Sequence, residues 1–116
     1  MTAPVEGFYS VYMTGKEGQG FAMIIFMAGR LIGADAAGCM FDGQYVEGGE
    51  GISVSLSIKA PPNVPRVQGG LTGSQGEENH LDFHLPQNFA SNEFVRIDTQ
   101  HGPVNVKLIR LRGISD

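Results

Sequence analysis

The sequence predicts an all-β protein, a small closed antiparallel β-barrel of about eight strands. Apolar and polar residues alternate with a period of two along most of the chain, which is typical of half-buried strands. No segment of helical length has the 3.6-residue period of an amphipathic helix. The chain of 116 residues contains 17 glycines, about twice the usual share of ~7%, and these favour tight turns between short strands.

The N-terminal half contains five predicted strands separated by glycine-containing turns. They are, in chain order, Phe8–Met13, Phe21–Ala28, Leu31–Asp35, Met40–Val46 and Ile52–Lys59. The fifth has the clearest alternation, because aliphatic side chains from Ile52 to Ile58 are interleaved with three serines.

The middle of the chain is less regular. Prolines 61, 62 and 65 exclude a central strand there, because proline cannot donate a backbone hydrogen bond to a neighbouring strand. A short strand is compatible with Arg66–Leu71, and Gly73–Asn79 is predicted as a polar loop. Leu81, Phe83 and Leu85 then alternate with polar residues in another strand.

The last two strands, Phe94–Thr99 and Val104–Leu111, form a predicted closing hairpin. The apolar face of the second one changes phase at Ile109, as a β-bulge would cause. Eight short strands fit one sheet that curls closed around a filled interior or one small ligand. A two-sheet sandwich is the competing architecture. The length predicts a single domain over residues 1–116.

Composition excludes several classes of function. The net charge of −4 argues against direct binding to nucleic acid or to an anionic membrane surface, both of which require clustered Lys and Arg. The longest apolar run, Phe21–Ala28, is far shorter than a membrane-spanning helix, and residues 1–15 lack the pattern of a secretory signal. The single cysteine, Cys39, favours a reducing cytoplasm.

The motifs that resemble catalytic or cofactor sites have simpler interpretations. The glycines at 15, 18 and 20 lie between two strands, whereas a phosphate-binding loop precedes a helix. His80, Asp82 and His84 alternate on one strand face, but the two histidines are too far apart to share a metal ion. No serine lies in a strand–turn–helix elbow, and Cys39 has no predictable base. We therefore expect a non-enzymatic protein with no cofactor and no metal.

The second strand is apolar on both faces, although a barrel strand needs only one apolar face. The surplus face predicts a homodimer or partner interface. The residues predicted for this interface are Phe21, Met23, Ile24, Ile25, Phe26 and Met27. The alternative is that the irregular segment Pro86–Glu93 covers this face.

Acidic turns offer a second candidate contact. Glu47 and Glu50 flank two glycines in a predicted exposed turn, where they would contact a basic partner such as a DNA-binding activator. Exposed glutamates also serve simply to solvate a loop.

The N-terminal half resembles a known family. Its pattern over about residues 6–58 consists of Glu6-Gly7-Phe8-Tyr9-Ser10, then Gly18-Gln19-Gly20, then Gly29-Arg30-Leu31-Ile32-Gly33-Ala34-Asp35, then Phe41-Asp42-Gly43-Gln44-Tyr45. In order and spacing these segments are similar to the GrlR-like negative regulators of type III secretion genes.

The resemblance implies a dimeric, calycin-like (lipocalin-like) barrel that represses by binding a transcriptional activator and keeping it from DNA. It places the family's acidic partner-binding loop at residues 47–50, where Glu47 and Glu50 are charged and two glycines are not. It also implies an alternative function, the binding of a lipid or another small apolar ligand inside the barrel.

Overall fold

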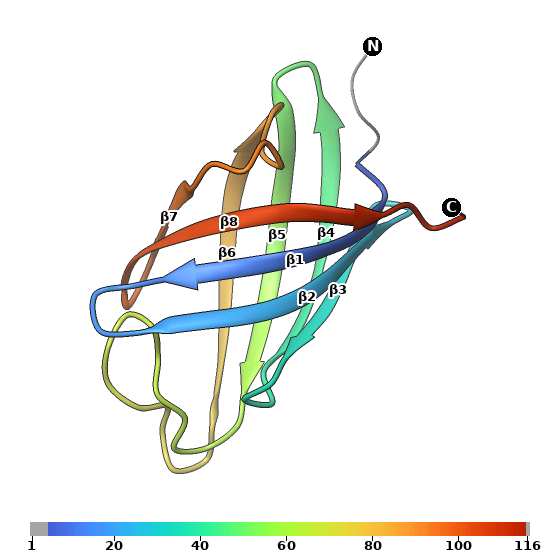
Figure 1. Cartoon of the computed structure of the whole chain (residues 1–116). Coiled ribbons are helices and arrows are strands. Elements are labelled where there is room, and N and C mark those ends of the chain that lie inside the picture. Colours follow the sequence, from blue (N-terminus) through green and yellow to red (C-terminus); the bar gives the residue numbers. More distant parts are fainter. Residues whose placement is uncertain (1–4, 116) are drawn as a thin grey trace.

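The computed structural model describes residues 5–115, and these form one antiparallel sheet of eight strands. The strands are β1 (Gly7–Thr14), β2 (Gln19–Met27), β3 (Arg30–Asp35), β4 (Met40–Gly48), β5 (Gly51–Ala60), β6 (Glu77–Pro86), β7 (Val95–Thr99) and β8 (Gly102–Arg112). Their order in the sheet is β6-β5-β4-β3-β2-β1-β8-β7. The sheet curls into a nearly closed barrel, so the barrel prediction is confirmed over the sandwich (Figure 1).

The strands follow the predicted ones closely, because each is fixed by its alternation and by the turn that ends it. The turn between β2 and β3 consists of Ala28 and Gly29, both with positive φ (51° and 80°). Two left-handed residues make the tight hairpin turn whose twist matches that of the strands. The Glu6 carboxylate accepts a hydrogen bond of 2.7 Å from the Ala28 amide, which fixes this turn against the start of the chain.

The middle of the chain differs from the sequence expectations in two details. No strand forms over Arg66–Leu71, where only an isolated bridge joins Pro65 to Leu71. Gly69 and Gly70 both have positive φ, and the Arg66 amide donates to the Gly70 carbonyl, so this segment turns rather than extends. The strand predicted over Leu81–Leu85 is longer than expected, because β6 already begins at Glu77.

The bulge in the last strand is present but lies closer to its end than predicted. Ser10 still pairs regularly with Ile109, and the register shifts only between Tyr9, opposite Arg110, and Phe8, opposite Arg112. Ile109 marks no phase change, because it stays in regular register opposite Ser10, which in turn pairs with the outward-facing Met23.

The core lines the inside of the barrel with alternate residues from all eight strands, together with Val5 before β1 and Phe89 after β6. Its buried members are Val5, Tyr9, Val11, Ala22, Ile24, Phe26, Leu31, Phe41, Tyr45, Ile52, Val54, Leu56, Leu85, Phe89, Ile97, Val104, Val106 and Leu108. Inward residues on β6 such as Leu81 and Phe83 are only half-buried, because β6 and β7 are the two ends of the sheet and do not pair.

Candidate functional site

The barrel interior contains a cavity of about 430 Å³. Its deep walls are apolar and include Ile24, Phe26, Leu56, Phe83 and Leu108. A volume of this size lies within the range of small-molecule sites, which are concave and mostly apolar. The cavity therefore has the size and chemistry to hold one small apolar molecule.

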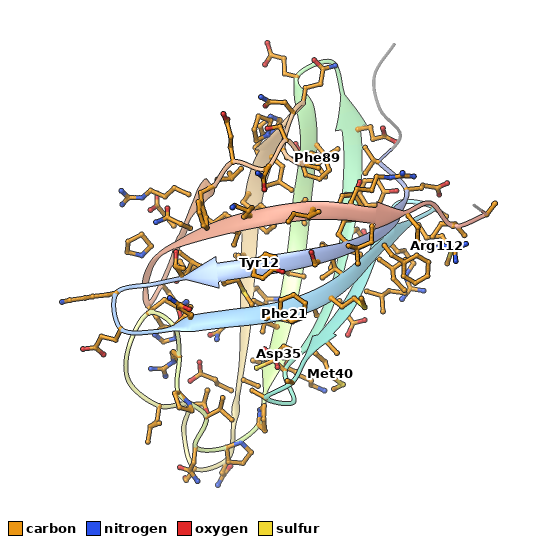
Figure 2. All side chains as sticks on the ribbon, viewed as in Figure 1. Tyr12, Phe21, Asp35, Met40, Phe89 and Arg112 are labelled. Carbon is orange, nitrogen blue, oxygen red and sulfur yellow. The ribbon has the colours of Figure 1, made fainter. Side chains whose placement is uncertain are left out.

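Four aromatic rings pack together inside the barrel, and one of them, Phe26, also lines the cavity. Phe26 is fully buried and contacts Tyr9, Tyr45 and Phe89 edge-on, with ring centroids 5.0–6.0 Å apart. Tyr9 donates a 2.6 Å hydrogen bond to the Val5 carbonyl, and burial raises its pKa to about 12, so the phenol stays neutral. Figure 2 shows Phe89 toward the end of the barrel opposite Asp35.

Polar side chains line the other end of the cavity, which we call the mouth and define by Asp35, Cys39, Arg66, Glu77 and His101. Arg66 binds Glu77 with two hydrogen bonds, of 2.6 and 3.0 Å. The His101 Nε2 atom lies 3.6 Å from the same carboxylate. The hydrogen bonds from Arg66 lower the pKa of Glu77 to about 2.

The thiol of Cys39 is also part of the mouth, but it is not poised to react. Burial first, and then the negative charge of Asp35, raise its pKa to about 11. Because the thiolate is the nucleophile, Cys39 is a weak one near neutral pH. The structure thus favours the interpretation of Cys39 as a half-buried packing residue.

Residues 61–76 fold across the mouth beside the β1–β2 turn (Figure 1). The Glu17 amide donates to the Val67 carbonyl, and Gln68 donates a 3.1 Å hydrogen bond to Thr99. The buried Thr72 holds the segment in shape, since its hydroxyl donates to the Pro61 carbonyl and accepts from the Val64 amide. These contacts tie the segment to the β1–β2 turn and to β7.

The outer face of β2 exposes a row of large apolar side chains. Phe21, Met23 and Met27 are 49%, 47% and 42% exposed. Ile24 and Phe26, which the sequence interpretation also placed in the interface, are buried inside the barrel. Side chains alternate strictly between the two faces of β2, so these two point inward. The interface prediction is wrong for Ile24 and Phe26, which are core residues.

The segment Pro86–Glu93 does not cover the outer face of β2. Its Phe89 stacks on Tyr9 on the inner side of the sheet, with ring centroids 5.8 Å apart. The proposed cover is therefore wrong, and the row remains exposed. Other strands add apolar side chains to this face: Tyr12 on the adjacent β1 packs against Phe21, and Met40 on β4, beyond β3, is 51% exposed (Figure 2).

Glu47 and Glu50 are both exposed next to the β4–β5 connection, but only Glu50 lies in the turn, because Glu47 still belongs to β4 and pairs with Ile52 on β5. Neither carboxylate forms an ion pair with any residue from 5 to 115. His84 contacts the backbone carbonyl of Glu50 at 3.1 Å, which fixes the turn without using either acidic group. Both charges thus face solvent.

The row of His80, Asp82 and His84 lies on the solvent side of β6, as alternation predicts. His80 shares a 2.7 Å hydrogen bond with Ser57 on β5. In the described part of the chain, no group of three or more His, Cys, Asp or Glu side chains could hold a metal ion. The polar row therefore acts as a solvated face of the sheet.

Residues 5–115 contain no helix long and apolar enough to cross a membrane. Comparison with protein-family models, with curated proteins and with solved structures finds no match to this chain. The cavity and the two exposed surfaces are therefore the features from which a function is inferred.

Proposed function

We propose that this protein is a non-enzymatic binding protein whose barrel holds a small apolar ligand. The cavity of about 430 Å³ is the single observation that supports this proposal most directly. Each CH₂ group of a ligand that leaves water contributes about 0.8 kcal/mol of favourable binding free energy. An alkyl chain that fills the space between these apolar walls therefore binds without any charged contact.

Extraction of the purified protein tests the proposal. A bound molecule is expected in near-stoichiometric amount when the protein is denatured and its organic extract is analysed by mass spectrometry. Ala22 lines the cavity and is 2% exposed, so Ala22→Leu should reduce the amount of ligand by filling part of the space. Ala34→Leu adds the same volume on the exposed side of β3 and should leave it unchanged. An extract without a ligand would contradict the proposal.

The exposed row on β2 supports the formation of a homodimer. Contiguous apolar side chains on a sheet face lower the free energy when a second copy removes them from water. The residues that serve this interface are Phe21, Met23, Ile25 and Met27. Light scattering coupled to size exclusion should give the mass of a dimer at micromolar concentration, and a monomer at every concentration would refute this assignment.

A second candidate function is that of a cytoplasmic negative regulator that sequesters a transcriptional activator, as in the GrlR-like family. The observation that favours it is the exposed turn with Glu47 and Glu50, whose charges are not neutralised within residues 5–115. An acidic, unpaired turn is complementary to the basic surface of a DNA-binding protein.

Charge reversal tests this contact. A DNA-binding protein captured from the cell lysate by the wild-type chain should be lost when Glu47 and Glu50 are both changed to Lys. The melting temperature should hardly change, because both side chains are exposed. Lysine substitutions at Glu78 and Glu93, which are also exposed, control for net charge. Equal capture by both double variants would exclude the turn as the contact.

A further inference from the structure

The charges at the mouth constrain the chemistry of the ligand, provided that the cavity binds one as proposed above. The charged side chains that line the cavity are Asp35, Arg66 and Glu77, and His101 is the remaining titratable side chain apart from Cys39. A ligand with a charged head group at this end would have to find its counter-ion among these groups.

Arg66 is not free to bind an anion. Its guanidinium forms two hydrogen bonds with Glu77 and a third, of 3.5 Å, with the Gly69 carbonyl. Glu77 accepts a further hydrogen bond of 3.0 Å from Asn79, so both partners of the ion pair are held in place. A bidentate pair of this kind is strong and directional, and an incoming carboxylate would have to displace Glu77 from it.

The remaining charge at the mouth is negative. Asp35 accepts hydrogen bonds from the amides of Ala37 and Cys39, of 3.0 and 2.9 Å, and forms no ion pair with any residue that the structure describes. The entrance therefore carries two carboxylates and one guanidinium, so negative charge exceeds positive charge there. An anionic head group would be repelled there, and it would also lose hydration without gaining a partner.

We propose that the barrel selects an uncharged amphiphile, of the class of long-chain alcohols, over a fatty acid of the same length. The alkyl chain would occupy the apolar part of the cavity, and the neutral head group would remain at the mouth. This selectivity is the opposite of that expected if an unpaired arginine lined the cavity.

Calorimetric titration of the ligand-free protein with decanol and with decanoate tests this inference. At pH 8 an ordinary imidazole is neutral and a fatty carboxylate is charged. We expect decanol to bind about tenfold more tightly than decanoate, or by a larger factor, because decanoate buries an unpaired charge. Equal binding, or tighter binding of decanoate, would overturn the inference and leave the ligand-binding function intact. Binding of neither compound would refute both the inference and the proposed function.

Two variants of the ion pair separate electrostatics from structural damage. Glu77→Gln releases Arg66 and should raise the affinity for decanoate severalfold, while Arg66→Gln removes the guanidinium partner of Glu77 and should lower it. The affinity for decanol should change little in either. Because both variants break the same contact, loosening of the mouth would shift the affinity for decanoate in the same direction in both. Shifts in the same direction would overturn the inference.

Discussion

Adjacent isoleucines on β2 provide the sharpest test of the barrel. Ile24 is 6% exposed and points into the core, whereas the neighbouring Ile25 lies on the outer face, paired with Phe8 and Ile32. Ile24→Asp and Ile25→Asp make the same chemical change one position apart, so they differ only in the side of the sheet that receives the charge.

The expected magnitudes differ widely. Replacing Ile24 removes about 1.5–3 kcal/mol of apolar burial. The buried carboxylate adds a penalty of several kcal/mol, because the buried residues of the described chain include no Lys or Arg to pair with it. The total of about 5 kcal/mol or more is comparable with the whole stability of a small domain, about 5–15 kcal/mol. Ile25→Asp should cost about 1 kcal/mol, since its carboxylate stays hydrated.

Circular dichroism, thermal melting and light scattering distinguish the outcomes. Ile24→Asp should have no cooperative melting transition. Ile25→Asp should melt close to the wild type but behave as a monomer, because it introduces a charge into the proposed dimer face. A folded Ile24→Asp variant would refute the assignment of the inner face. A folded Ile25→Asp dimer would refute this face as the interface.

Three further predictions concern the core, a close backbone contact and the mouth. Phe26→Ala should lower the free energy of unfolding in urea by about 3–5 kcal/mol, because the ring is fully buried among three other aromatic rings; a loss below 1 kcal/mol would contradict this packing. Gly33→Ala should destabilise the fold by about 1–3 kcal/mol, because the new Cβ would lie 2.5 Å from a carbonyl oxygen of β2. Gly49→Ala is the matched control: its new Cβ would have no heavy atom within 4 Å, and stability should change by less than about 0.5 kcal/mol. The pKa of Glu77 is about 2 in the folded state, below the ordinary glutamate value of about 4.3, so its ion pair with Arg66 stabilises the fold above pH ~4.3 and this stabilisation is lost as the pH falls toward 2. The melting temperature of wild type should therefore fall more steeply than that of Glu77→Gln over this range, and parallel curves would contradict the shift.

Local patterns determined most of the fold before any tertiary information. A period of two requires strands, and tight glycine turns between short strands require antiparallel neighbours. The sequence missed the extension of β6 to Glu77 because Glu77, Glu78 and Asn79 are polar and carry no alternation. It was also compatible with a short strand over Arg66–Leu71, where the positive φ of two glycines makes the chain turn.

The candidate site depended much more on the tertiary structure. Both faces of β2 are apolar, so the sequence by itself determined that one face is surplus but not which one. The choice follows from register, which pairs Ile24 with Tyr9 and places both inside the barrel. The mouth had no local signal, because Arg66, Glu77 and His101 come from separate segments and meet only when the sheet curls. Periodicity records which residues share a face of a strand, whereas contacts between distant segments are decided by the curvature of the whole sheet.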